Sequence, residues 1–180
     1  MGKWETIEKK TIYRNEWISL NVDAVRQPDG NDGQYSVINT SDTISIIVKD
    51  DDNKIRFVYL HRYPINAYSW EVIKGRMDGD SPIDAAKREL AEEMSLEANK
   101  WTALGHFNPF NGLCGELNTV FLAEKLTTCD TNMREEEGIA EIKSFSLAKI
   151  DNMITNNEIK DSFTISAIYK YKLFLESKHD

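Results

Sequence analysis

The first part of the chain consists of short runs in which apolar and polar residues alternate, the pattern of half-buried β-strands. Runs at residues 17–22 and 35–38 flank the segment 28–33, whose Pro, Asp and Gly residues favour a tight reversal. A second pair of runs, 43–48 and 55–60, is separated by an Asp/Asn-rich turn. The pattern therefore predicts two successive strand pairs before any helix.

The apolar spacing becomes helical after residue 80. Ser81 has a side chain that can cap a helix, and Pro82 suits the first helical position, so we expect a helix from there to about Met94. Its apolar residues recur every three or four positions and form one buried stripe: Ile83, Ala86, Leu90 and Met94.

The second half of the chain returns to strands and ends in helices. Segments 101–107 and 117–122 read as strands around a Gly/Asn/Pro-containing loop. Ser146 is a possible cap of a short helix, and 161–176 reads as a longer one. Strands, a central helix, more strands and terminal helices predict an α/β fold with a mixed sheet that carries helices on its faces.

Charge and composition limit the partners. The 180 residues include 22 Lys and Arg against 30 Asp and Glu, a net charge of −8, which argues against binding a nucleic-acid polymer or an anionic membrane surface. No apolar run reaches the length of a membrane span, and the first ten residues lack the apolar core of a secretory signal. With only Cys114 and Cys129, both expected to be reduced, we expect a cytoplasmic protein.

Three glutamates within the predicted helix are the strongest chemical signal. At about 100° per residue, Glu89, Glu92 and Glu93 share roughly 100° of arc beside the buried stripe. Like charges at this spacing repel, and Mg²⁺ converts the repulsion into ligation because it prefers carboxylate oxygens. The alternative is a solvated helix face on which Arg88 pairs with Glu92.

The residues around these glutamates resemble the Nudix box, Gly-x5-Glu-x7-Arg-Glu-U-x-Glu-Glu-x-Gly-U, where U is aliphatic. The matching segment is Arg88-Glu89-Leu90-Ala91-Glu92-Glu93-Met94-Ser95-Leu96, preceded by Gly75 and Asp80. Three positions depart from the pattern. Four residues rather than five follow Gly75, Asp80 replaces the first Glu, and Ser95 replaces the last Gly. If the helix ends at residue 95 in the left-handed conformation, Ser costs about 1 kcal/mol relative to Gly.

The resemblance extends beyond the box. Arg62-Tyr63-Pro64 and Trp70-Glu71-Val72-Ile73-Lys74-Gly75 are similar to segments of ADP-ribose pyrophosphatase-like Nudix proteins, with Ile73 in place of Pro and Lys74 in place of Ala. Residues 157–167 are similar to their Gly-x-Ile-x-Asp-x-x-Thr helix entry. This resemblance implies a Nudix-type α/β/α sandwich over residues 41–180. It also implies a β-rich N-terminal extension over residues 1–40 that forms a homodimer.

The resemblance also implies roles for individual residues. Glu89, Glu92 and Glu93 would bind Mg²⁺, with Mn²⁺ as a substitute, and Arg88 would orient Glu89. Glu135 or Glu137 would serve as the general base of a loop that also contains Glu136. Substrate contacts are expected from Arg62, Trp70, Glu71 and Gly75, with Trp17 and Tyr68 as further aromatic residues that can stack on a base.

The implied activity is hydrolysis of the pyrophosphate bond in a nucleoside diphosphate linked to another moiety, such as ADP-ribose or a nucleotide sugar. One alternative is a Nudix-fold module that binds a nucleotide without cleaving it. Another is a pyrophosphohydrolase of nucleoside triphosphates or of GDP-mannose. The loop 109–112 lies where such enzymes shape the substrate pocket, but its sequence differs from the family pattern, so the exact substrate stays open.

Overall fold

A computed structural model describes residues 2–178. The chain forms two compact units, one made of the residues up to Asp42 together with Asn108–Leu117, the other of Thr43–Phe107 and the residues from Asn118 onward. None of the helices in the described part is long and apolar enough to cross a membrane. Cys114 and Cys129 are free thiols, as the sequence predicts.

The N-terminal unit is an antiparallel sheet. Its strands within residues 2–178 are β1 (Glu5–Glu8), β2 (Thr11–Arg14), β3 (Ser19–Arg26) and β4 (Asp32–Asn39). The central strand β3 pairs with all the others, and the predicted hairpin is the β3–β4 pair, in which Ser19 lies opposite Asn39 and Arg26 opposite Asp32. The loop Asn108–Leu117 adds to β4, because Ile38 donates its backbone N–H to Leu113 and Tyr35 donates its hydroxyl to the Gly112 carbonyl.

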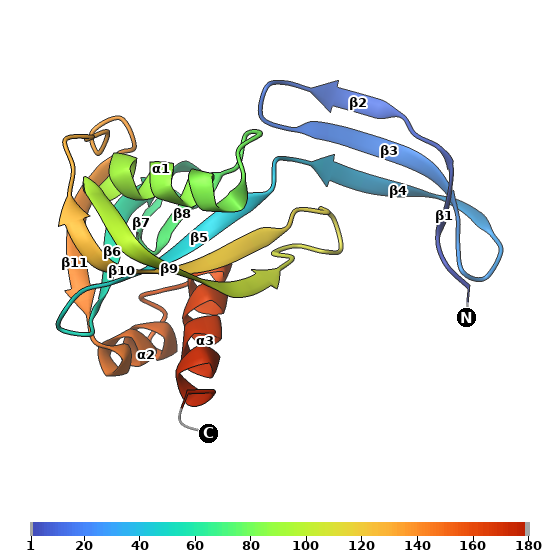
Figure 1. Cartoon of the computed structure of the whole chain (residues 1–180). Coiled ribbons are helices and arrows are strands. Elements are labelled where there is room, and N and C mark those ends of the chain that lie inside the picture. The colour runs from blue at the N-terminus through green and yellow to red at the C-terminus, as the bar shows by residue number, and fades with distance from the viewer. Residues whose placement is uncertain (1, 179–180) are drawn as a thin grey trace. The chain divides into compact units, whose positions relative to one another are not determined.

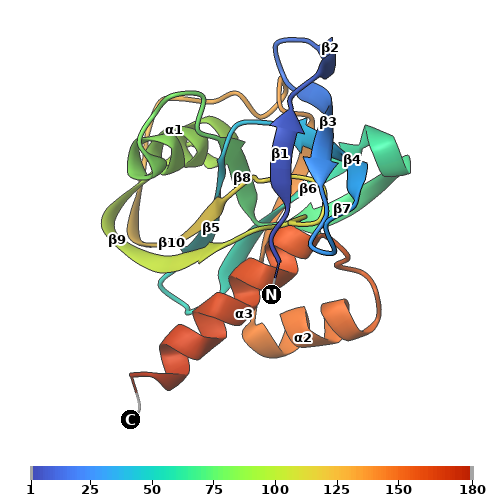
Figure 2. The same cartoon turned by 90° about the vertical axis from the view of Figure 1, so that its right-hand side faces the viewer.

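The second unit is built on a mixed sheet (Figures 1 and 2). Its strands in the described residues are β5 (Thr43–Lys49), β6 (Ile55–Arg62), β7 (Ala67–Glu71), β8 (Ile73–Arg76), β9 (Leu96–Phe107), β10 (Asn118–Thr128) and β11 (Ile139–Phe145). The main path is β11-β6-β5-β10-β9, with β10 parallel to β5 and the other pairs antiparallel. Strands β7 and β8 follow one another directly in the chain. Strand β7 pairs with β6 and β8 pairs with β5, beyond the short segment in which β5 and β6 pair with each other.

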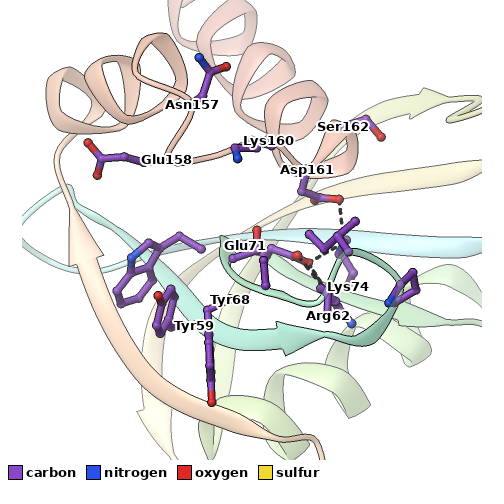
Figure 3. A pocket seen from close by; sticks show the side chains of 15 residues that line it. Tyr59, Arg62, Tyr68, Glu71, Lys74, Asn157, Glu158, Lys160, Asp161 and Ser162 are labelled. Atoms are coloured by element: carbon purple, nitrogen blue, oxygen red, sulfur yellow. Dashed lines mark hydrogen bonds and ion pairs between the residues drawn. The ribbon is translucent and has the colours of Figure 1, made fainter.

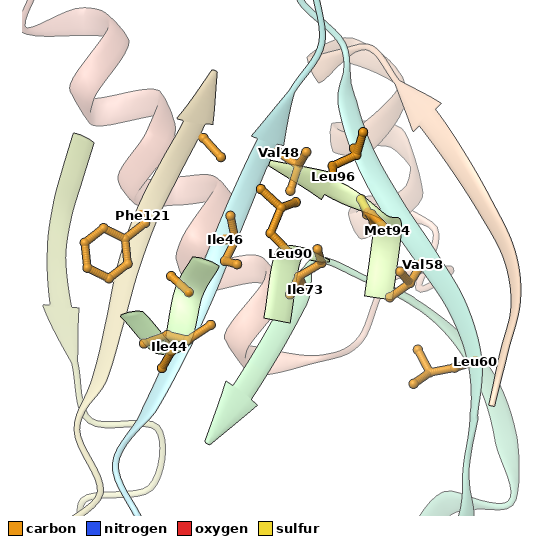
Figure 4. Packing of buried hydrophobic residues seen from close by; sticks show 13 residues of the cluster. Ile44, Ile46, Val48, Val58, Leu60, Ile73, Leu90, Met94, Leu96 and Phe121 are labelled. Atoms are coloured by element: carbon orange, nitrogen blue, oxygen red, sulfur yellow. The ribbon is translucent and has the colours of Figure 1, made fainter. Parts of the chain in front are cut away.

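Helices cover both faces of this sheet, which confirms the predicted three-layer architecture (Figure 1). Helix α1 (Pro82–Met94) packs on one face, where its Leu90 and Met94 belong to the same buried cluster as Ile44, Ile46 and Ile73 of the sheet (Figure 4). Helices α2 (Leu147–Thr155) and α3 (Ser162–Glu176) cover the other face over Ile47, Phe57 and Leu122. A 3₁₀ turn, η1 (Tyr63–Ile65), joins β6 to β7.

Candidate active site

Helix α1 begins where its sequence predicts. The Ser81 hydroxyl accepts the backbone N–H of Asp84 at 3.3 Å and donates to the Asp84 carboxylate at 2.6 Å, while Pro82 occupies the first turn. The helix ends at Met94, and Ser95 adopts the left-handed conformation with φ 55° and ψ 42°. Burial of the apolar stripe fixes which side of α1 faces the sheet. Glu89 and Glu93 each directly precede a residue of the stripe, so their side chains are also buried.

Arg88 ties the glutamates to the loop that precedes the helix. Its Nη1 contacts the carboxylates of Glu89 at 2.7 Å and Glu92 at 3.1 Å. Its Nη2 donates to the Arg76 carbonyl at 2.8 Å, and its Nε to Asp80 at 3.3 Å. Both arginine pairs considered from the sequence, with Glu89 and with Glu92, are therefore present. The shorter Asp80 still reaches the guanidinium across the shortened loop.

Gly75 provides the surface on which Glu89 lies. A Cβ atom at residue 75 would stand 2.1 Å from the Glu89 carboxyl carbon, far inside van der Waals contact. Gly75 belongs to β8 and pairs with Ile44 in β5, so its backbone cannot withdraw without breaking the sheet. Glycine at this position is required by the close approach of the Glu89 side chain.

Burial makes these carboxylates costly to ionise. Glu89 is 8 % and Glu93 7 % exposed. Burial, followed by the negative charges of Glu92 and Glu137, raises the pKa of Glu89 to about 7 despite the opposing charge of Arg88. Burial, then Glu89 and Glu137, also raises the pKa of Glu93, although Arg62 and Lys74 oppose the shift. Within residues 2–178, the Glu93 carboxylate has neither a hydrogen bond nor an ion pair.

The donor set suits a divalent cation. Three carboxylates, half-buried or buried, stand on one helix face with Arg88 paired to two of them, and hard cations of the Mg²⁺ type take such oxygen ligands. In the described part of the chain, no three His, Cys, Asp or Glu side chains are already grouped closely enough to hold a metal ion. Arg88 instead occupies the Glu89 and Glu92 oxygens, so a cation must displace these contacts to use all three glutamates.

The acidic loop that follows β10 is anchored to the end of α1. Met133 donates its backbone N–H to the Glu92 carbonyl at 3.0 Å, and Arg134 Nη2 donates to the Met94 carbonyl at 2.6 Å. These contacts bring Glu137 close enough for its charge to raise the pKa values of Glu89 and Glu93. Glu135 and Glu136 lie in the same exposed turn.

A network of ion pairs lies at the junction of β7 and β8 (Figure 3). The Glu71 carboxylate accepts Arg62 Nη2 at 2.7 Å and Lys74 Nζ at 2.7 Å, and Lys74 also contacts Asp161 at 3.0 Å. Asp161 caps α3 by accepting the backbone N–H of Thr164 at 2.8 Å. Sequence reasoning selected Arg62 and Glu71 but missed Lys74, Asp161 and Thr164 as members of this network. The Asp-x-x-Thr spacing was the available signal.

The aromatic candidates have separate positions. Trp70 is half-buried between Tyr59, at 4.6 Å between ring centroids, and Phe145, at 5.0 Å. Tyr68 stacks on Tyr59 at 5.1 Å and is largely exposed. Trp17 belongs to the N-terminal unit. Trp70 and Tyr68 therefore form one aromatic cluster of the second unit through their shared neighbour Tyr59.

Comparison with known protein families shows which family the chain belongs to. Residues 40–165 match the model of the NUDIX domain. The chain belongs to the Nudix family. The expectation drawn from the box residues is thereby confirmed, and residues 4–38 additionally match the nucleoside diphosphate sugar hydrolase N-terminal domain.

Relatives that match this Nudix protein over most of its length are known. An ADP-ribose pyrophosphatase of Bacillus subtilis is 28% identical over 171 residues, covering 94% of this chain and 92% of the relative. One from Mycobacterium tuberculosis is 28% identical over 168 residues, covering 92% and 81%. The crystal structure of an ADP compounds hydrolase superposes with a TM-score of 0.85 at 16% identity, covering 99% of this chain and 97% of that one, so it shares the fold.

Proposed function

We propose that this protein is a Mg²⁺-dependent hydrolase that cleaves the pyrophosphate bond of a nucleoside diphosphate linked to another moiety. The substrate class is that of ADP-ribose and the nucleotide sugars. The observation that carries this proposal is the pair of buried glutamates, Glu89 and Glu93, held on one face of α1 with Glu92 beside them. The names of the full-length relatives support the substrate class.

In this proposal Glu89, Glu92 and Glu93 hold the cation, with Mn²⁺ as a substitute. When bound, the cation would neutralise charge on the diphosphate and activate the attacking water. Arg88 keeps Glu89 turned toward Gly75.

The substrate contacts of the proposal come from the strands beside α1. Arg62 offers a guanidinium to a phosphate oxygen, and Glu71 holds that guanidinium in place at 2.7 Å. Trp70 supports this part of the sheet by packing against Tyr59. Gly75 makes no side-chain contact with the substrate in this proposal; its lack of a Cβ atom leaves room for the Glu89 side chain.

Glu137 is the better candidate for the general base, since its charge is among those that raise the pKa values of Glu89 and Glu93. Its carboxylate takes a proton from the water as the water oxygen bonds to phosphorus. The bond from phosphorus to the bridging oxygen breaks, and the products are a nucleoside monophosphate and a phosphorylated remainder.

Substitution of Glu93 tests the proposal. Glu93→Gln keeps the size of the side chain and removes the ligand charge, so turnover of ADP-ribose in Mg²⁺ should fall by orders of magnitude at an unchanged circular-dichroism spectrum. Glu97→Gln, an exposed change on β9, is the matched control. Equal turnover of both variants would refute the proposal. Calorimetric binding of ADP-ribose without product release would instead support the non-catalytic module.

A substrate panel separates the enzymatic alternatives. ADP-ribose, nucleotide sugars including GDP-mannose, and nucleoside triphosphates should be compared by kcat/KM under the same Mg²⁺ concentration. Preference for ADP-ribose or a nucleotide sugar fits the proposal. A preference for nucleoside triphosphates would replace the substrate class while leaving the proposed metal site in place.

We extend the proposal to assembly through the N-terminal unit. Its strands β1 and β2 are exposed throughout, and its exposed large apolar side chains are Trp4, Ile7, Ile12, Tyr13, Trp17 and Ile18. Monomeric proteins rarely expose so many apolar side chains on one small element. Light scattering should therefore give the mass of a homodimer, and Ile12→Lys combined with Trp17→Lys should shift it toward the monomer.

A further inference from the structure

Lys74 is a largely buried lysine in the wall of a pocket of about 910 Å³ (Figure 3). Strand alternation turns its side chain away from α1, because its neighbours Ile73 and Gly75 both face that helix. Its ammonium lies 5.0 Å from the centre of the Phe163 ring, in the first turn of α3. Lysine is rarely enclosed in this way without partners for its charge.

Two carboxylates share the Lys74 ammonium (Figure 3). Its Nζ lies 2.7 Å from Glu71 Oε2 and 3.0 Å from Asp161 Oδ1. The other Asp161 oxygen accepts both the backbone N–H and the hydroxyl of Thr164, which fixes this carboxylate at the start of α3. Asp161 therefore holds the ammonium of Lys74 beside Glu71.

Arg62 is the second cation on Glu71. Its Nε lies 3.2 Å and its Nη2 2.7 Å from the Glu71 carboxylate oxygens. Within residues 2–178, its third nitrogen, Nη1, makes no hydrogen bond. In the proposed function this guanidinium meets a phosphate oxygen, so the share of its charge that Glu71 neutralises decides how strongly it attracts the phosphate.

The charges of these four side chains balance. Arg62 and Lys74 carry two positive charges against the two negative charges of Glu71 and Asp161. Without the lysine, one arginine would face two carboxylates, and the excess negative charge would lie where the phosphate is to bind. Because Glu71 is 2 % exposed, water screens these charges poorly.

The network also acts on the α1 glutamates. Burial raises the pKa of Glu93, and the charges of Arg62 and Lys74 oppose that shift. The pocket wall and the proposed metal site therefore lie within electrostatic range of each other. A change of charge at Lys74 is consequently felt where the substrate is to bind, as well as in the anchoring of α3.

We infer that Lys74 is a positioning residue that takes part of the charge of Glu71 and so leaves the guanidinium of Arg62 available to a phosphate of the substrate. The inference rests on the proposed function, which supplies the phosphate. Lys74 acts through Glu71 and Arg62 and does not touch the substrate. Neutralising either member of the Lys74–Asp161 pair should therefore have opposite effects, since one change adds negative charge to the network and the other removes it.

Lys74→Met and Asp161→Asn test the inference on the full chain. Methionine keeps an unbranched stem beside Phe163 without the charge, so the KM of ADP-ribose at saturating Mg²⁺ should rise about tenfold with kcat unchanged. Asp161→Asn lets Lys74 serve Glu71 alone and should lower KM about twofold. The double variant restores the balance of charge, so its KM should return to that of the natural protein. Lys87→Met, which removes an exposed lysine of α1, is the matched control and should change neither constant.

These variants separate the positioning role from two others. A purely structural ion pair would lower the folded fraction, and with it kcat, in both single variants. A direct contact between Lys74 and the substrate would leave the double variant as weak as Lys74→Met. Either pattern, or an unchanged KM in Lys74→Met, overturns the inference. Circular dichroism checks folding, and if Lys74→Met does not fold, the direction of the KM change in Asp161→Asn decides.

Calorimetry with ADP in EDTA repeats the comparison without turnover. The Kd should be lowest for Asp161→Asn, higher for the natural protein and the double variant, and highest for Lys74→Met. This order without any cleavage of ADP-ribose would refute the proposed function and support the inference. Cleavage with equal KM and Kd values in all variants would do the reverse. A natural protein that neither cleaves ADP-ribose nor binds ADP would overturn both.

Discussion

Gly75 and Glu89 are in such close contact that a single methyl group at residue 75 would occupy the space of the glutamate carboxyl carbon, 2.1 Å away. The contact joins strand β8 to helix α1 and fixes where the Glu89 oxygens lie. Through it, the sheet sets the position of the first glutamate, and the buried stripe of α1 sets the others.

Gly75→Ala should consequently displace Glu89 and abolish most of the activity. We expect kcat to fall about 100-fold and the free energy of unfolding to fall by about 1–3 kcal/mol from overpacking. Turnover and urea denaturation measure the two effects. Gly115→Ala, where an added Cβ meets nothing within 4 Å, is the control and should change neither quantity.

The raised pKa of Glu89 predicts a pH-dependent stability in the absence of metal. The folded protein keeps a proton on Glu89 up to about pH 7, whereas the unfolded chain releases it near pH 4.5. The folded state therefore binds more protons in this window, and the free energy of unfolding decreases as the pH rises through it. Thermal unfolding in EDTA should show this decrease, and Mg²⁺ should stabilise more at the upper end because it replaces the proton.

Glu89→Gln provides the control for this pH dependence, because glutamine does not ionise. The metal-free variant should lose stability less steeply over the same pH window, with Glu93 contributing the part that remains. If the free energy of unfolding of the variant and of the natural protein fell equally steeply with pH, the pH dependence would not come from Glu89.

Arg134 should influence turnover although it lies outside the glutamate cluster. Its contact with the Met94 carbonyl anchors the loop of Glu137 to the end of α1. Arg134→Ala should lower kcat about tenfold by loosening the proposed base, and Arg134→Lys should restore part of it by keeping a donor. Arg26→Ala, which removes an exposed pair with Asp32, serves as the comparison. A change in KM alone, at full kcat, would argue against a role through Glu137.

Asp161 combines two stabilising roles that substitutions can separate. Asp161→Asn keeps an oxygen for the Thr164 backbone N–H and removes the charge that faces Lys74, whereas Asp161→Ala removes both. We expect Asp161→Ala to cost about 1–2 kcal/mol in unfolding free energy and Asp161→Asn less. Ser146→Ala, the cap of α2, measures the cost of losing a cap without an ion pair.

The parts of the structure that the sequence predicted are those encoded locally. The cap at Ser81 and the apolar stripe to Met94 both depend on residues within a few positions of one another, and both are present. Helix α3 likewise begins next to Asp161, as the pattern indicates.

The parts that could not be predicted depend on residues far apart in the chain. Nothing near Arg134 indicates that its guanidinium reaches the carbonyl of Met94, 40 positions earlier. The ion pair of Lys74 with Asp161 also needs the sheet and α3 to be assembled first. In the same way, the family resemblance pointed to Glu135 or Glu137, and only the assembled structure shows that the charge of Glu137 raises the pKa values of Glu89 and Glu93.

Because the loop Asn108–Leu117 belongs to the N-terminal unit, truncation of the chain at one position cannot separate the two units. The chain crosses between them at residues 42–43, 107–108 and 117–118, so removing everything before Thr43 would not release an intact catalytic domain. It would leave Gly112 and Leu113 without the Tyr35 and Ile38 donors that hold them, at the ends of the two longest strands. Loss of the N-terminal sheet should therefore loosen the ends of β9 and β10 that flank this loop.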